Sequence, residues 1–401
     1  MTTPDSVHLP QGFSFSTATA GIKASGRPDL AFVQACEGTS AAAVFTRNRV
    51  VAAPLIVGRR SLAKTGGKVR AVIVNSGNAN CATGKAGIKA CELVCRETAK
   101  ALEIKADEVF PSSTGIIGVP LPADKIVARL LGLLASGSST TEAVTNFAQA
   151  IMTTDTRMKI SSVQVQAGKS EFSLLGVAKG AGMIHPQLAT MLVYLFTDVS
   201  ATPGQLKSLL GETCDQTFNC ISIDGDTSTN DTVLLLASGQ SGAKLSLPAV
   251  KKKFAEALTS ISQSLAEQIV ADGEGVKHVI RLFVEQAKNH EEALRVAKAV
   301  SHSLLVKTAW AGADPNWGRI LAAMGASGVP IDPDRVEISI ASQSVFRRGA
   351  VQSFDEMAAH QALSQPRCDI QIKLGRGKSK LLFHTTDLTT EYVHINADYS
   401  T

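Results

Sequence analysis

Short β-rich runs alternate with stretches of helical periodicity along the whole chain, and this alternation narrows the folds open to it. The run VRAVIV at 69–74, for example, is followed by the turn signal NSGN and then by apolar residues at helical spacing from Ile88 to Leu102. No sequence repeat of fixed period accompanies the pattern, which excludes solenoids and propellers. We therefore expect a layered α/β fold, with helices packed on mixed β-sheets.

The expected elements cover both halves of the chain. The helical stretches are 88–102, 122–131, 141–150, 203–213, 250–271 and 291–305. The strand-like runs are 69–74, 172–177, 191–196, 232–237, 276–284, 336–341, 370–374 and 381–384. A chain of 401 residues holds two to three structural units at roughly 150 residues each, or one large α/β body.

The composition argues against several function classes. Hydrophobic residues make up 44% of the chain and charged residues 19%, proportions typical of ordered globular proteins. The formal net charge is +5, but no basic stripe with interleaved aromatic residues accompanies it, and the chain has only two Trp and three Tyr. Recognition of nucleic acids is therefore not expected. No run of about 18 apolar residues is present, so we expect no membrane span.

The cysteines favour a reducing compartment. The seven cysteines are odd in number and form no C-x-x-C motif, so neither a disulfide framework nor a zinc ribbon is expected. Cys91 and Cys95 share one face of an expected helix, where we predict apolar packing rather than metal binding. The N-terminal residues lack the basic and apolar regions of a secretion signal. The combination predicts a cytoplasmic protein.

Common catalytic signatures are missing. The sequence has no P-loop, no H-E-x-x-H and no G-x-S-x-G motif. The acidic loop 224–231 invites comparison with a calcium loop, but Thr229 stands where glycine is needed and Leu235 where a bidentate glutamate is needed. We interpret this loop as a tight turn whose side chains bond backbone groups. No metal site is predicted.

Several polar, glycine-containing segments together carry a family resemblance. The stretch KGAGMIHPQLATML at 179–192 resembles the self-cleavage site of the ornithine acetyltransferase family, the bifunctional glutamate N-acetyltransferases of arginine biosynthesis. His185, Gln187 and Trp310–Ala311 depart from the family's pattern, which bears on fine specificity. Further matches occur in the family's order and span nearly the whole chain: NSGNAN at 75–80, MTTDT at 152–156, IDGDT at 223–227, DGEG at 272–275, DPNWGR at 314–319 and NADYST at 396–401.

The resemblance implies self-cleavage between Ala189 and Thr190, as in N-terminal-nucleophile enzymes. The products would be an alpha fragment, 1–189, and a beta fragment, 190–401. The chemistry is coherent: the Thr190 hydroxyl attacks the preceding carbonyl, and water hydrolyses the resulting ester. The freed α-amino group of Thr190, with an ordinary pKa of about 7.7–8.0, then serves as base for its own hydroxyl near neutral pH.

The resemblance also assigns roles to other residues. Thr114 and Gly115 match the family's oxyanion pair, which would donate hydrogen bonds to the tetrahedral intermediate. We interpret Glu274 as the partner of the ornithine side-chain ammonium. The matched substrate-contacting positions are Thr153, Lys179, Thr190, Glu274, Asn396 and Thr401.

The implied reaction is a ping-pong acetyl transfer. N2-acetyl-L-ornithine acetylates Thr190, L-ornithine leaves, and L-glutamate accepts the acetyl group to give N-acetyl-L-glutamate. No metal or organic cofactor is expected, and a bifunctional member would also use acetyl-CoA as co-substrate. The family implies an assembly of two alpha and two beta fragments.

Two other function classes are compatible with the residues. An N-terminal-nucleophile amidase or aminopeptidase would share the cleavage but pass the acyl group to water. A non-catalytic protein on the same scaffold would only bind a small molecule. Two residues near the motifs receive structural interpretations: His185 is expected to be hydrogen-bonded or exposed rather than a base, and Arg319 to tie a helix start to a loop.

Overall fold

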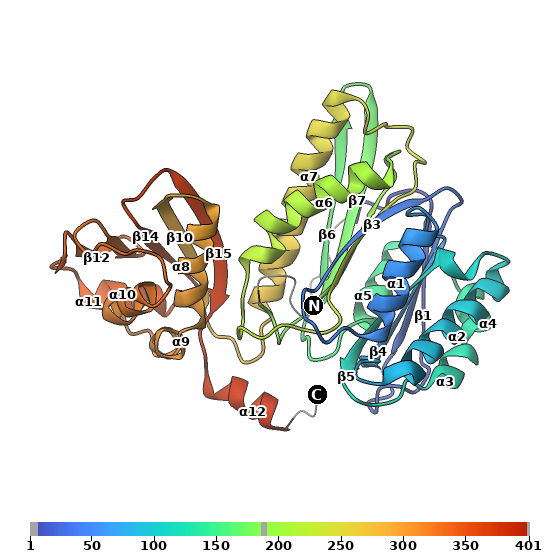
Figure 1. The fold of residues 1–401 in the computed structure, drawn as a ribbon, viewed down its shortest axis with the longest axis horizontal. Coiled ribbons are helices and arrows are strands. Elements are labelled where there is room, and N and C mark those ends of the chain that lie inside the picture. Colours follow the sequence, from blue (N-terminus) through green and yellow to red (C-terminus); the bar gives the residue numbers. More distant parts are fainter. Residues whose placement is uncertain (1–6, 186–190, 399–401) are drawn as a thin grey trace.

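Two β-sheets stacked face to face form the body of the protein, and a third sheet with its helices forms a lobe at one side (Figure 1). The computed structural model describes residues 7–185 and 191–398. The layered α/β class expected from the sequence is confirmed. Within the described residues, no helix is long and apolar enough to cross a membrane.

The first sheet has the strand order β1-β2-β4-β5, in which only the β4/β5 pair is parallel. Helices α1 to α4 cover its outer face. Its strands are β1 (Phe13–Ala18), β2 (Leu30–Ala35), β4 (Ala71–Asn78) and β5 (Val109–Ile116). Its helices are α1 (Ala53–Lys64), α2 (Gly84–Leu102), α3 (Ala123–Val127) and α4 (Leu130–Ala135), with a short 3₁₀ turn, η1 (Ala106–Glu108), before β5.

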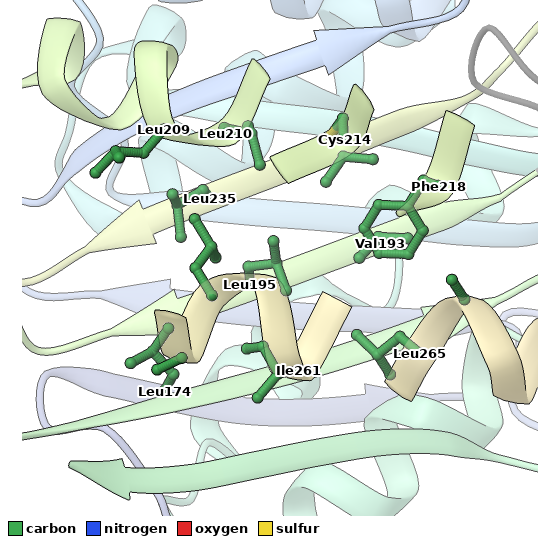
Figure 2. Packing of buried hydrophobic residues seen from close by; sticks show 14 of the residues in the cluster. Leu174, Val193, Leu195, Leu209, Leu210, Cys214, Phe218, Leu235, Ile261 and Leu265 are labelled. Atoms are coloured by element: carbon green, nitrogen blue, oxygen red, sulfur yellow. The ribbon is translucent and has the colours of Figure 1, made fainter. Parts of the chain in front are cut away.

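The second sheet has the order β3-β9-β8-β7-β6, and helices α6 and α7 cover its outer face (Figure 2). Strands β8 and β9 are parallel neighbours at its centre. Its strands are β3 (Ser40–Phe45), β6 (Lys159–Ala167), β7 (Ser170–Lys179), β8 (Leu192–Thr197) and β9 (Thr232–Ala237). The helices packed with this sheet or at the edge of the sandwich are α5 (Thr141–Ala150), α6 (Pro203–Gln216) and α7 (Pro248–Ala271), with the 3₁₀ turn η2 (Phe218–Cys220) after α6.

Strand β8 shows why the body has four layers. Val193 and Leu195 point toward α6 and α7 (Figure 2). Leu192, Tyr194 and Phe196 instead pack in the interface between the two sheets. Alternate side chains of a strand face opposite sides, so an apolar residue at every position requires cover on both faces. Each fully buried Leu or Phe side chain stabilises this packing by about 1.5–3 kcal/mol.

The C-terminal lobe contains a six-stranded sheet with the order β13-β12-β11-β14-β10-β15. Its strands are β10 (Val279–Ala287), β11 (Glu337–Ile340), β12 (Gln343–Arg347), β13 (Ala350–Val351), β14 (Arg367–Lys373) and β15 (Ser379–Thr386). Its helices are α8 (His290–His302), α9 (Leu304–Ala311), α10 (Trp317–Gly325) and α11 (Glu356–Leu363). A last helix, α12 (Thr390–Asp398), leaves the lobe and extends beneath it toward the body (Figure 1).

Two stretches that were each predicted as one continuous helix are interrupted in the structure. The stretch 122–131 forms two short helices, α3 and α4, instead of one. The stretch 291–305 is interrupted at Ser303, whose backbone is extended and whose side chain accepts a hydrogen bond from the Val306 amide to begin α9. The apolar packing expected for Cys91 and Cys95 is confirmed, since both are buried among the helices over the first sheet.

Candidate active site

A pocket of about 610 Å³, including its open mouth, lies where strand ends of both stacked sheets meet the segments leading to and from the lobe. Strand β5, the end of β7, the loop before β9, the turn after α7 and helix α12 all contribute to its wall. The lining residues are Ala79, Thr114, Gly115, Ile117, Thr153, Thr154, Lys179, Gly182, Met183, Ser228, Thr229, Asn230, Glu274 and Asn396.

Lys179 is the buried cation of this pocket. It is the last residue of β7 and only 2% exposed. Its Nζ donates to Thr153 Oγ1 at 2.8 Å and to Thr114 Oγ1 at 3.2 Å. Because the ammonium occupies lone pairs of both hydroxyls, the hydroxyl protons are free to donate to other acceptors in the pocket. The arrangement therefore presents two O–H donors backed by a positive charge.

Gly115 allows β5 to approach β4 unusually closely beside these donors. Its φ is +134°, and a Cβ placed there would lie 2.3 Å from the Gly77 carbonyl carbon and 2.5 Å from the Asn78 amide nitrogen. No side chain fits such a contact without moving backbone. The glycine therefore fixes where the Thr114 hydroxyl and the neighbouring amides stand.

Asp155 is the acidic partner of Lys179 in its buried place. One Asp155 oxygen lies 3.8 Å from Lys179 Nζ, while the other accepts from Lys159 Nζ at 2.7 Å and from the Gly180 amide at 2.6 Å. Burial alone would raise the pKa of Asp155, but Lys179 and Lys159 outweigh it and hold that pKa well below its usual range. Burial lowers the pKa of Lys179, and Asp155 opposes this shift. Asp272 completes the network as the second partner of Lys159, at 2.6 Å.

Glu274 provides the negative charge on the opposite wall. Asn396 Nδ2 from α12 donates to Glu274 Oε2 at 2.9 Å, and the Glu274 amide donates to the Ala181 carbonyl at 2.9 Å. A Cβ at Gly182 would lie 2.4 Å from Glu274 Oε2, so the missing side chain makes room for the carboxylate. The pocket thus holds a cation and an anion on different elements, as a substrate with both charges requires.

His185 is hydrogen-bonded, as interpreted from the sequence, whereas Arg319 is structural but bonds to a helix and not to a loop. His185 Nδ1 lies 3.0 Å from His302 Nε2, which is also 3.0 Å from Ser222 Oγ. Burial lowers the pKa of His185 to about 4 and that of His302 to about 3, so both rings are neutral at pH 7. Arg319 Nη1 donates to the Leu305 carbonyl at 2.7 Å and thereby ties the start of α10 to α9.

The structure gathers every described residue that was assigned to the site from the sequence. Thr114, Gly115, Thr153, Lys179, Glu274 and Asn396 all line this one pocket. Ala189, Thr190 and Thr401 lie outside the described residues. The loop 224–231 was interpreted as a turn in which side chains bond to backbone groups. The structure confirms this, since the Asp224 carboxylate accepts from the Asp226 amide at 3.1 Å. Among the described residues, no group of three or more His, Cys, Asp or Glu could hold a metal ion.

The comparison with protein families decides the classification. Residues 14–401 match the model of the ArgJ family. The chain belongs to the ArgJ family. This confirms the family expected from the motifs, and with it an enzyme of acetyl transfer in arginine biosynthesis.

Individual relatives agree with the ArgJ assignment. The "Arginine biosynthesis bifunctional protein ArgJ" of Bradyrhizobium diazoefficiens is 41% identical over 396 residues, which cover 97% of this chain and 95% of the relative. The protein of the same name from Thermus thermophilus is 42% identical, with 98% and 100% covered. A solved structure of an ArgJ protein from Bacillus halodurans is 38% identical over 50% of this chain and 96% of that chain, with a TM-score of 0.48.

Sequence reasoning missed eight residues that line this ArgJ pocket. Ser228, Thr229 and Asn230 belong to the acidic loop that was interpreted only as a turn. Asn230 Nδ2 donates to the carbonyls of Ala79 and Ser113, at 2.7 and 2.9 Å, and so joins this loop to the first sheet. Position within the quoted family motifs was the available signal for Ala79, Thr154, Gly182 and Met183. The others are Ile117, Thr154, Gly182 and Met183.

Proposed function

We propose that this chain cleaves itself between Ala189 and Thr190 and then carries acetyl from N2-acetyl-L-ornithine to L-glutamate on the Thr190 hydroxyl. The observation that supports the proposal best is the convergence of Thr114, Lys179 and Glu274 on one pocket. These residues come from three separate parts of the sequence, and they supply an oxyanion donor, a buried cation and a carboxylate. Family membership provides the reaction class.

The proposed transfer has two half-reactions. In the first, the Thr190 oxygen bonds to the acetyl carbonyl carbon, the carbon–nitrogen bond of acetylornithine breaks, and the proton passes through the Thr190 amine to the leaving ornithine nitrogen. In the second, the glutamate nitrogen bonds to the acetyl carbon, the ester carbon–oxygen bond breaks, and a proton from the glutamate amine returns to the Thr190 oxygen. Each half passes through a tetrahedral oxyanion, for which the Thr114 hydroxyl, held by Lys179, is a preorganised donor.

Glu274 selects the substrate that enters first. Its carboxylate faces the pocket and keeps one oxygen beyond the Asn396 bond for a second partner. The ornithine side chain ends in an ammonium group, which a carboxylate recognises by a charge-assisted hydrogen bond. L-Glutamate lacks that ammonium group, so Glu274 distinguishes the donor from the acceptor.

The second sheet would hold the two fragments together after cleavage. Strands β3, β6 and β7 precede residue 190, whereas β8 and β9 follow it, and β7 pairs with β8 from Leu174↔Thr197 to Lys179↔Leu192. Strand β3 pairs with β9 along its whole length. Fragments 1–189 and 190–401 would therefore share one sheet and one core.

The remaining parts of the proposal concern the cofactors, a second acetyl donor, the assembly and the location. Acyl exchange through an ester uses a nucleophile, a base and oxyanion donors, so the cycle calls for no metal or organic cofactor. Relatives named bifunctional support acetyl-CoA as a second acetyl donor for glutamate. We also propose that two alpha fragments and two beta fragments assemble into one complex. A cytoplasmic location fits the seven cysteines, all of which are free.

Intact mass measurement of the natural chain and of Thr190→Ala tests the proposal first. We expect two fragments from the natural chain, the larger beginning Thr-Met-Leu-Val, and one uncut chain from the variant. An assay with acetylornithine and glutamate follows. Release of ornithine without acetylglutamate would instead identify an amidase, and an uncut natural chain that only binds acetylornithine would identify a binding protein.

Glu274→Gln tests the role in substrate selection. We expect KM for acetylornithine to rise about 10- to 100-fold, as for the loss of a charged hydrogen-bond partner, while cleavage continues. Glu256→Gln on the exposed face of α7 is the matched control and should change neither. An unchanged KM in Glu274→Gln would remove this role.

A further inference from the structure

Two aspartates of one loop hold the two described ends of the segment that contains residues 189 and 190. The Asp224 carboxylate accepts from the Met183 amide at 2.5 Å and from the Ile184 amide at 2.8 Å. Asp231 Oδ1 accepts from the Met191 amide at 3.0 Å. Both aspartates belong to the loop 224–231, which the transfer mechanism above does not use.

The bond between Met191 and Asp231 directly precedes the parallel register of β8 and β9. Leu192 pairs with Thr232, and the bonds from Met191 to Asp231 and from Ile184 to Asp224 each join residues 40 positions apart. The constant separation means that the stretches 184–191 and 224–231 have equal length. The chain entering β8 and the chain entering β9 are thus fastened together at both ends of these stretches.

Asp224 binds a backbone shape that the sequence does not favour by itself. Met183 has φ = +56°, a left-handed conformation that is uncommon for a residue with a Cβ. In this conformation the successive amides of Met183 and Ile184 point the same way and form a cradle for an anion. The Ile184 carbonyl is fixed as well, by the Ile223 amide at 2.9 Å and Ser222 Oγ at 3.0 Å.

Asp231 fixes the residue directly after Thr190. It is 1% exposed, and the Met191 carbonyl accepts from the Thr232 amide at 3.2 Å on the same side. Three covalent bonds separate the Met191 nitrogen from the nitrogen of residue 190, so fixing Met191 restricts where the scissile peptide can stand.

We infer that the loop 224–231 is the positioning element of self-cleavage, with Asp224 and Asp231 holding the two ends of the cleavage segment so that the Thr190 hydroxyl meets the carbonyl before it. The inference rests on the proposed cleavage at Ala189–Thr190. In that step the Thr190 oxygen bonds to the Ala189 carbonyl carbon, the peptide carbon–nitrogen bond breaks, and the hydroxyl proton ends on the Thr190 nitrogen. Water then adds to the ester, which leaves an Ala189 carboxyl group and restores the hydroxyl. We assign Asp224 and Asp231 a positioning role, because the amides that they hold belong to residues other than the two that react.

Time-resolved cleavage of the full-length chain, made by cell-free synthesis and followed by intact mass, tests the inference. We expect Asp224→Ala to slow cleavage at least tenfold, and Asp224→Asn, which keeps one acceptor oxygen, to slow it less. Asp226→Ala is the matched control, because Asp226 lies in the same loop with its side chain exposed, and it should cleave within twofold of the natural rate. Equal rates in Asp224→Ala and the natural chain would overturn the inference.

Two further readouts separate positioning from general loss of structure. In Asp224→Ala, acetyl transfer per cleaved chain should stay within about twofold of the natural value. Adding Met183→Gly to Asp224→Ala should raise the cleavage rate of that variant at least threefold, because glycine adopts a positive φ without strain. Parallel loss of transfer and melting temperature, or no recovery, would overturn the positioning role. If Asp224→Ala does not fold, Asp224→Asn and Asp231→Asn decide: unchanged cleavage in both overturns the inference.

The natural chain and Thr190→Ala keep this test independent of the proposed function. A natural chain that stays uncut, or a Thr190→Ala chain that cleaves, contradicts the proposed cleavage whatever the aspartate variants do. Normal cleavage in the natural chain with normal cleavage in all aspartate variants contradicts only the role of the loop.

Discussion

The pocket end of the two-sheet body and the C-terminal lobe bury very different side chains. The pocket end buries Lys159, Lys179, Asp155 and Asp272 together, each less than 7% exposed. The core cluster of the lobe is apolar. Its buried Lys307, 2% exposed, donates to Thr386, and the Arg281–Asp369 ion pair lies at the surface with side chains 31% and 41% exposed. Both regions are well packed, so packing alone does not account for the buried charges.

The difference shows which region carries the desolvation cost of a buried network of charges. Desolvating a charge costs several kcal/mol, and an apolar replacement of a buried ion pair is often neutral or stabilising. In the body, the buried charges lie beside the Thr114 and Thr153 hydroxyls, to which Lys179 donates. In the lobe, the buried Lys307 donates to Thr386, and the surrounding core cluster is apolar.

Asp155→Ala should produce the largest effect. It leaves the buried ammonium groups of Lys159 and Lys179 without their shared partner, and we expect a loss of about 3–5 kcal/mol in the free energy of unfolding. Urea denaturation measures the loss. A change below about 1 kcal/mol would mean that the buried network is no more important to stability than the surface pairs of the lobe.

Gly115→Ala should cause the second-largest loss of stability, and Gly349→Ala in the lobe is the variant to compare with it. Both glycines have positive φ, but a Cβ at Gly115 meets backbone, whereas one at Gly349 meets the side chain of Asp334. We expect about 2–4 kcal/mol of destabilisation at Gly115 and about 1 kcal/mol at Gly349 in thermal or urea unfolding. Similar losses at both sites would show that backbone crowding beside Thr114 is not decisive.

The pH dependence of stability probes the junction of the two regions, where His302 of the lobe meets His185 of the body. Burial lowers the pKa of His302 from its ordinary 6.5 to about 3. Between these two pH values the unfolded chain binds a proton at His302 and the folded chain does not. Stability therefore falls as the pH falls below 6.5. Between pH 7 and pH 5, His302→Gln should reduce this fall by about 1–2 kcal/mol in urea titrations.

The exposed His290 at the start of the same helix provides the control. His290→Gln should leave the pH dependence as it is in the natural chain. Asp224 shifts stability in the opposite sense, because burial raises its pKa to about 6, and it does so equally in both variants. An identical pH profile in His302→Gln and the natural chain would contradict the neutral buried pair.

Arg281→Ala should have the smallest effect. The pair with Asp369 is bidentate, at 2.5 and 2.6 Å, but it is open to solvent and salt. We expect a loss of about 0.2–1 kcal/mol, reduced further at high salt. A loss above about 2 kcal/mol would show that the lobe also depends on its ion pairs.

The sequence predicts the elements with strong local signals and misses those that depend on their neighbours. Strand β9 and helix α5 have the expected bounds, because β9 is an uninterrupted β-rich run and Thr140 caps α5. Strand β3 was missed, since its sequence SAAAVF has few large apolar residues and becomes a strand by pairing with β9. β-propensity depends on such context.

The site shows the same division. Thr114, Lys179 and Glu274 were assigned through motifs of the whole family, since no local spacing brings residues so distant in sequence together. Asn230 was missed because its role depends on bonds to Ala79 and Ser113, which exist only in the folded chain. The pairing of Asp224 with Met183 was equally hidden, because it joins two loops 41 residues apart and exists only in the folded chain.

The equal lengths of the stretches 184–191 and 224–231 also restrict how this protein can diversify. The bonds from Ile184 to Asp224 and from Met191 to Asp231 fix both ends of the two stretches, so an insertion or deletion in either one has to be accommodated between fixed ends. The exposed turn at 168–169 joins β6 to β7 and is not fastened in this way to a second stretch of the described chain. Length variation should therefore be tolerated better in surface turns than in these two stretches.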